Sequence, residues 1–74
     1  MPDSPRGLAV RDRLARGLLP HEEPPRVWVG KGTDRACDGC GESVGAAEKE
    51  TEIDVADRTY RFHDHCLSVW RLVR

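Results

Sequence analysis

Apolar residues at the start of the chain recur with the period of a helix. In residues 8–19, Val10, Leu14 and Leu18 repeat every fourth position, which predicts a short helix that ends before Pro20. A helix of this length is marginal in isolation, so we expect its apolar face to pack on the rest of the chain. A free partner-binding arm is the alternative interpretation.

The middle of the chain has no such period. Residues 20–36 contain three prolines and two glycines, which predicts an extended connector. Val27-Trp28-Val29 forms an apolar island within it. A tryptophan in a loop is either a binding anchor or part of a small core, and its large apolar area favours the core.

The second half of the chain alternates and then returns to a helical period. Acidic residues at positions 50, 52 and 54 alternate with less polar ones at 51, 53 and 55, the pattern of a half-buried strand. A turn at Ala56-Asp57 and a second strand over residues 58–62 complete a predicted β-hairpin. From position 63 onward apolar residues recur at helical spacing, so we expect a final helix.

The composition indicates that packing alone is weak. Of 74 residues, 38% are hydrophobic and 34% are charged, so a core this small needs a metal or disulfides to support it. Three cysteines are an odd number for a closed disulfide framework. The start of the chain does not resemble a secretory signal, and no apolar segment approaches the roughly 20 residues of a membrane span. We therefore expect a cytoplasmic protein without membrane contact, in which clustered cysteines bind metal.

The spacing of the cysteines is typical of a zinc site. Cys37-x2-Cys40 is followed by 22 residues and then by His63-x2-Cys66. A Cys-x-x-Cys turn, here with glycines at 39 and 41 that permit positive φ angles, brings two thiolates to one tetrahedral ion. His63 and Cys66 share a face if both lie in the first turn of a helix. The pattern predicts one structural Zn²⁺ per chain, bound by these four residues; a redox-active cysteine pair is the alternative.

His65 is a rival for the fourth ligand position. It adjoins Cys66, and neighbours on a helix point to different faces, so it would serve only if the helix began later. The helical spacing favours His63.

A cysteine knuckle, a hairpin and an aromatic-His-x2-Cys segment resemble the first half of a LIM domain and, more broadly, treble-clef zinc fingers. The resemblance covers about residues 37–70. It implies a small α+β domain stabilised by metal, in which a zinc knuckle, a β-hairpin and a C-terminal helix follow one another, and it implies a protein-binding role. The chain is also similar to short bacterial proteins that carry a helix–proline–Trp lead-in before such a finger, a similarity that implies no defined activity. We expect a lead-in over residues 1–26, comprising the N-terminal helix and the proline-rich connector, and a zinc module over 27–74.

The distribution of charge narrows the expected partners. Residues 1–36 hold seven basic and five acidic residues, a net of +2, whereas residues 37–74 hold five and eight, a net of −3. An acidic module is poorly suited to phosphates, so we expect a protein-interaction or assembly module. Nucleic-acid binding through a basic arm is the alternative, carried by Arg6, Arg11, Arg13, Arg16 and Arg26. A thiol or metal sensor is the second alternative.

Catalysis is not expected. Four protein ligands leave a zinc ion no open position for water or substrate, and the sequence has no separate nucleophile–base pair and no phosphate-binding loop. The predicted catalytic residues are therefore none, and zinc is the one cofactor predicted.

Overall fold

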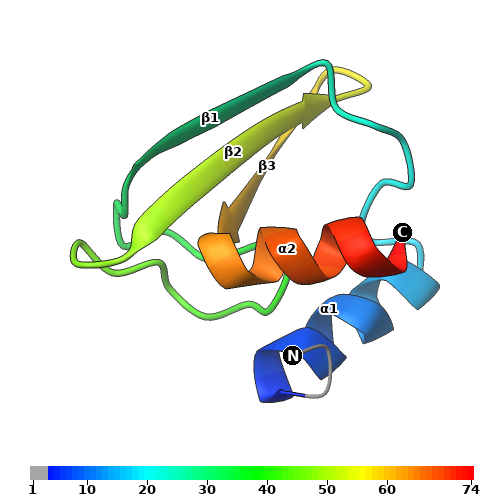
Figure 1. Cartoon of the computed structure of the whole chain (residues 1–74), viewed down its shortest axis with the longest axis horizontal. Coiled ribbons are helices and arrows are strands. Elements are labelled where there is room, and N and C mark those ends of the chain that lie inside the picture. Colours follow the sequence, from blue (N-terminus) through cyan, green and yellow to red (C-terminus); the bar gives the residue numbers. More distant parts are fainter. Residues whose placement is uncertain (1–3) are drawn as a thin grey trace.

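The computed structural model describes residues 4–74, which form two helices and one three-stranded antiparallel sheet (Figure 1). The elements are α1 (Pro5–Ala15), β1 (Arg26–Lys31), β2 (Lys49–Val55), β3 (Arg58–His63) and α2 (Asp64–Val73). The α+β class, the hairpin and the final helix agree with the sequence-based expectation. Neither helix is long and apolar enough to cross a membrane.

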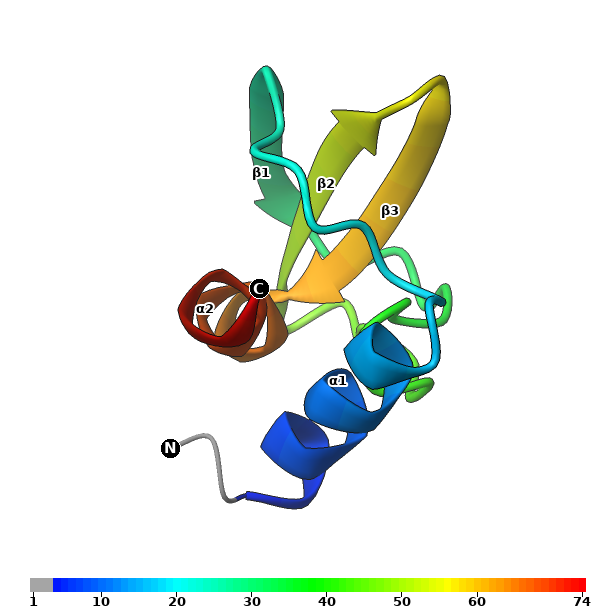
Figure 2. The ribbon, with the colours of Figure 1, turned by 90° about the vertical axis from the view of Figure 1, so that its right-hand side faces the viewer.

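The elements stack in a fixed order. The sheet runs β1-β2-β3, and α2 packs on β2 and β3. α1 lies against α2, on the side away from the sheet, as Figures 1 and 2 both show. The buried apolar side chains come from both helices, from β2 and β3 and from the loops: Val10, Leu14, Leu19, Val44, Ile53, Val55, Tyr60, Phe62, Leu67, Val69 and Trp70. The N-terminal helix is therefore docked and does not extend as a free arm. The predicted division of the chain after residue 26 stays a prediction.

The bounds predicted for the first helix were wrong at both ends. Ser4 caps its N-terminus, with its side-chain oxygen accepting a hydrogen bond from the Gly7 N–H at 3.1 Å, and Pro5 occupies the first turn. Gly17, at φ 76°, ends the helix; its N–H and that of Leu18 donate to carbonyl oxygens of the last turn, a Schellman motif. Leu18 therefore lies outside the helix and is exposed, although it was predicted to belong to the apolar face of the helix. Leu19 is buried in its place.

The connector contains a strand that the sequence pattern did not predict. β1 pairs with β2 over its whole length, from Arg26 opposite Asp54 to Lys31 opposite Lys49. The expectation that Trp28 fills the core was also wrong, because 47% of this residue is exposed on the sheet. Trp70, with no exposed surface, fills the core instead.

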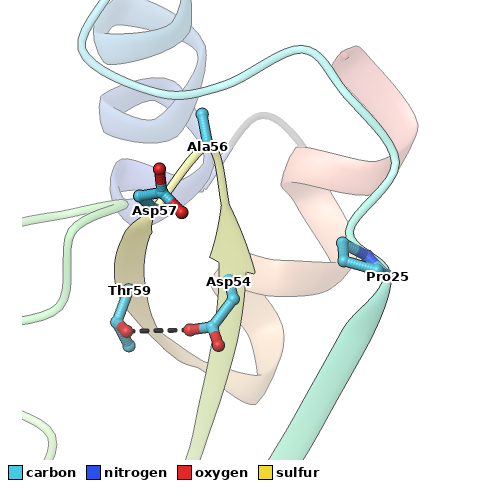
Figure 3. Close-up of a pocket in the computed structure, with 5 residues that line it drawn as sticks. All are labelled: Pro25, Asp54, Ala56, Asp57 and Thr59. Atoms are coloured by element: carbon cyan, nitrogen blue, oxygen red, sulfur yellow. Dashed lines mark hydrogen bonds between the residues drawn. The ribbon is translucent and has the colours of Figure 1, made fainter.

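The hairpin turn has the predicted position. Ala56 and Asp57 both have positive φ, the geometry of a two-residue turn that matches the twist of β2 and β3. Beyond the turn, the Thr59 hydroxyl donates a hydrogen bond of 2.8 Å to Asp54 (Figure 3). These residues and Pro25 line an open, acidic pocket at this end of the sheet.

Candidate metal centre

Four predicted ligands meet at one point between the knuckle, the end of β3 and the start of α2. One ligand atom from each of Cys37, Cys40, His63 and Cys66 lies within 4.8 Å of the other three. Cys37, His63 and Cys66 are buried, and Cys40 is partly exposed. The geometry is that of a zinc-finger-like site able to hold a metal ion.

The knuckle, residues 37–41, is a tight loop closed by backbone hydrogen bonds. The Gly41 N–H donates to the Cys37 carbonyl at 2.8 Å, and the Cys37 N–H donates to the Glu42 carbonyl at 2.8 Å. Gly41 has a φ of 84°, a backbone conformation that residues with a side chain rarely adopt, so glycine fits this position. A β-bridge between Ala36 and Ser43 joins the two ends of the loop.

Gly39 serves a different purpose from the one expected. Its φ is not positive; instead, the chain passes so close to the core that a Cβ would force neighbouring side chains to shift. A Cβ at this position would lie 3.0 Å from side-chain atoms of Phe62 and Val10 and 3.2 Å from Cys66 Cβ. Glycine therefore allows the knuckle to approach β3, α1 and α2 at once.

Asp38 fastens the knuckle to the hairpin. Its N–H donates to the Arg61 carbonyl at 2.6 Å, and its carboxylate accepts from the Arg61 N–H at 2.7 Å. The Arg13 side chain of α1 donates to the Asp38 carbonyl at 3.2 Å. The two cysteines of the knuckle are thus held at a set distance from His63 by backbone contacts on both sides.

His63 is oriented by a backbone acceptor. It ends β3 and caps α2, which begins at Asp64, so it is not inside the helix as the spacing argument assumed. Its Nε2 lies 3.0 Å from the Ser43 carbonyl oxygen. A carbonyl only accepts, so Nε2 carries a proton, and in the neutral imidazole the lone pair of Nδ1 is then free.

The free Nδ1 faces the sulfurs. It lies 3.4 Å from Cys40 Sγ and 3.7 Å from Cys66 Sγ. In a tetrahedral zinc site with bonds of about 2.0 and 2.3 Å, nitrogen and sulfur lie about 3.5 Å apart. The orientation set by Ser43 is therefore the one a metal ligand requires.

The three thiols interact strongly enough to separate their acidities. A hydrogen bond from the Cys66 thiol lowers the pKa of Cys37 to about 4. Burial opposes this shift, and a hydrogen bond from the His63 backbone N–H adds to it. The hydrogen bond to Cys37, together with burial, raises the pKa of Cys66, and burial raises the pKa of Cys40. One thiol therefore ionises readily and two resist. A divalent cation at the centre would supply the charge that three thiolates need, so the donor set fits such an ion.

The structure does not bring His65 to the cluster. Its Nε2 lies 3.1 Å from the hydroxyl oxygen of Ser4, at the start of α1. His65 thus contacts the N-terminal cap of α1 and is not one of the four clustered residues, although it lies between His63 and Cys66 in the sequence.

The sequence predicted that the glycines at 39 and 41 let backbone N–H groups point at sulfur, but it did not indicate the other groups that support the ligands. The Gly39 and His63 N–H groups donate to Cys37 Sγ at 3.2 and 3.4 Å, and the Ser43 carbonyl accepts from His63. The Glu48 carboxylate lies 3.7 Å from His63 Nε2. The contacts of the His63 N–H and the Ser43 carbonyl use backbone atoms, which every residue has, so no residue type could have indicated them.

Comparison of the chain with protein-family models, curated proteins and solved structures gave no match. The features that indicate a function are therefore the geometry of the Cys₃His cluster and the surface around it. Of these, the cluster is the stronger observation, because four separated positions of the sequence converge on it.

Proposed function

We propose that the Cys₃His cluster binds one structural zinc ion and that the chain acts as a small protein-interaction or assembly module. The observation that carries the zinc assignment is the convergence of four ligand atoms within 4.8 Å, with the His63 Nδ1 lone pair turned toward the sulfurs. Three sulfurs and one imidazole suit Zn²⁺ better than the hard cations that prefer oxygen.

A structural role for the ion follows from the ligand count. Four protein ligands complete a tetrahedral shell, whereas catalytic zinc keeps a position for water or substrate. Cys37, Cys66 and His63 are at most 2% exposed, which leaves little access to the centre. This arrangement supports a non-catalytic protein.

The order of elements supports the treble-clef assignment. The knuckle that carries Cys37 and Cys40 precedes the β2–β3 hairpin, and α2 supplies Cys66 from its first turn. The knuckle thus supplies two ligands, and the junction of hairpin and helix supplies the other two. This is the arrangement implied by the resemblance to treble-clef fingers. The strand β1 and the helix α1 are additions to that unit.

Internal pairing of two of the five arginines of the predicted basic arm favours a protein partner over a nucleic acid. Arg6 lies 3.4 Å from both Glu42 and Glu48, and Arg16 lies 3.3 Å from Asp12. Because these cations already have carboxylate partners, they contribute less to a phosphate-binding surface. The exposed apolar residues of β1 offer a surface of the other kind.

Two measurements test the proposal. Elemental analysis of the purified chain should give about one zinc per molecule. Affinity capture with the zinc-loaded chain from its native cells, with and without nuclease, should retain protein partners after nuclease treatment. Partners that disappear with nuclease would overturn the interaction role in favour of nucleic-acid binding, and a folded preparation without metal would overturn the zinc assignment.

The partial exposure of Cys40 favours a thiol sensor as the second candidate. Hydrogen peroxide would take two electrons from Cys40 and Cys37, whose sulfurs would join in a disulfide while the peroxide is reduced to water. Zinc release at micromolar peroxide, reversed by a dithiol reductant, would support the sensor. Release only at millimolar peroxide would exclude it.

A further inference from the structure

We propose that the free edge of β1 is an association site and that its occupant is β1 of a second copy of this chain. Pairing of the two strands would join two three-stranded sheets into one six-stranded antiparallel sheet. The inference deepens the proposed interaction role and rests on it. It names the surface and the partner.

β1 is an edge strand with unpaired backbone groups. It pairs on one side with β2, and the described residues place no strand on its other side. The Gly32 N–H donates to the Glu48 carbonyl at 2.9 Å, one step beyond the end of the β1–β2 register. Hydrogen-bonded pairs alternate in an antiparallel ladder. The backbone N–H and C=O groups of Trp28 and Gly30 therefore also point toward β2, whereas those of Val27 and Val29 point away from it. These outward groups are available to another strand.

The side chains of β1 are apolar on both faces of the sheet, yet uncovered. Val27, Trp28 and Val29 are 39%, 47% and 63% exposed. α2 contacts β2 and β3 but not β1. Edge strands are commonly protected by inward charges, prolines or bulges, and the centre of β1 has none of these. An exposed Val-Trp-Val edge of this kind favours strand pairing.

The strand is complementary to itself in one register. A twofold axis perpendicular to the sheet keeps the faces of both copies aligned, so it allows Trp28 to lie opposite Trp28 of the second copy. Val27 then lies opposite Val29, and the outward N–H and C=O groups of these residues form hydrogen-bonded pairs on both sides of the axis. Apolar side chains meet apolar side chains on each face.

Charges also fit this register. Arg26 lies opposite Gly30 of the second copy, where the absence of a side chain leaves open space. On the same face, Trp28 pairs with Glu52, whose side chain is 37% exposed, so Arg26 extends toward this carboxylate across the interface. Glu50, which pairs with Gly30, is buried and already bonded to Arg61 and Thr33. Shifting the strand by one further pair would place Val27 opposite the charged Lys31. The Trp28-centred register therefore joins opposite charges and places no like charges directly opposite each other.

The interface is small. Six residues per strand bury less area than a standard protein interface, which places the dimer among weak, reversible associations. We expect dissociation constants in the micromolar range, so experiments must cover concentrations up to about 1 mM.

Sedimentation equilibrium of the zinc-loaded full chain tests the proposal. We expect the mass to rise from the 8.3 kDa monomer toward twice that value as concentration increases. Val29→Lys, which places a charge on the edge, should weaken association at least about tenfold, whereas Leu72→Lys, the same change at an exposed position of α2, should leave it unchanged. Val29→Pro removes an outward N–H without breaking the ladder to β2 and should also yield a monomer. Zinc content and amide dispersion of each variant establish that it is folded.

Oxidative cross-linking tests the register. Trp28→Cys should form an intermolecular disulfide with itself in the zinc-loaded chain, because directly opposed positions of a non-hydrogen-bonded pair lie about 4.5 Å apart. Leu72→Cys should not. Cross-linking at Val29→Cys in preference to Trp28→Cys would overturn the stated register.

Failure of the inference differs from failure of the proposed function. A chain that stays monomeric at about 1 mM, or that dimerises equally well with Val29→Lys, overturns the β1 dimer. If that chain still captures protein partners after nuclease treatment, the interaction role stands and the partner is a different protein.

Discussion

The indole N–H of Trp70 in α2 donates a hydrogen bond of 2.8 Å to the carbonyl oxygen of Pro20, fifty residues earlier in the chain. The ring is fully buried and lies 5.9 Å from the ring of Phe62. Arg74 stacks on the indole at 5.0 Å and donates to the carbonyl of His21. One side chain thus joins the connector, the sheet and the C-terminal helix.

Trp70→Phe should therefore destabilise the fold. The smaller ring leaves a cavity and leaves the buried Pro20 carbonyl without its donor, which together should lower the free energy of unfolding by about 2–4 kcal/mol. Trp28→Phe is the matched control and should cost less than about 0.5 kcal/mol, because Trp28 is exposed. Urea unfolding measures both. Equal losses for the two variants would show that Trp28 also belongs to the core.

Removal of zinc should unfold the chain. Zinc binding in small fingers contributes on the order of 10–16 kcal/mol, more than the net stability of most small domains. A chelator near neutral pH should collapse the dispersion of the amide signals of β2 and β3 in an NMR spectrum, and added zinc should restore it. Dispersion that persists after metal loss has been verified would mean that packing alone suffices.

The two histidines near the cluster should differ in their effect on zinc. His63→Ala removes one of the four proposed ligands, so zinc affinity should fall at least about 100-fold and the fold should loosen. His65→Ala removes only the 3.1 Å contact to Ser4 at the start of α1, and should cost about 1 kcal/mol of stability without loss of zinc. Competition with a chromophoric chelator measures the affinity. A larger loss of zinc in His65→Ala would reverse the ligand assignment.

Gly39→Ala should destabilise the knuckle. Its Cβ would lie 3.0 Å from atoms of Phe62 and Val10, so the core must shift, at a cost of about 1–3 kcal/mol. Gly30→Ala is the control, because nothing lies within 4 Å of a Cβ at that position of β1. Thermal unfolding of both variants at saturating zinc tests this expectation. A neutral Gly39→Ala would show that the knuckle is loosely packed.

Glu50 should make stability depend on pH on the acid side. Burial raises the pKa of this carboxyl, but the Thr33 hydroxyl at 2.7 Å and the Arg61 guanidinium at 3.0 Å outweigh that effect, so its pKa lies below its usual 4.5. A carboxyl with a lowered folded-state pKa stabilises the fold fully above 4.5, and that contribution is lost as pH falls below 4.5.

Glu50→Gln tests this dependence. The variant should be less stable than the wild type at neutral pH, and the difference should shrink as pH falls below about 4.5, in urea unfolding at saturating zinc. Glu52→Gln is the control, since Glu52 makes a longer, more exposed pair of 3.8 Å with Arg61. A difference that stays constant with pH would contradict the assignment.

Local patterns in the sequence determined the elements whose signals are short in range. The alternation over residues 50–55, the turn at Ala56-Asp57 and the helical period after position 63 each depend on neighbours within a few residues, and each element lies where the pattern indicated. The spacing of Cys37, Cys40, His63 and Cys66 likewise predicted the set that converges in space. Metal-ligand spacing is informative because few backbone geometries bring two pairs of donors to one point.

Tertiary structure alone decided what depends on distant partners. The Val27-Trp28-Val29 segment is too short and too close to prolines to show a strand period, and it becomes β1 only because β2 presents a free edge more than twenty residues later. Which tryptophan is buried followed from the same pairing, since the register places Trp28 beside Glu52, on the face of the sheet opposite to the buried Ile53. The orientation of His63 depends on the Ser43 carbonyl, a group that every residue carries. Side-chain periodicity encodes which face of an element is apolar, but it does not encode which other element that face or edge will meet.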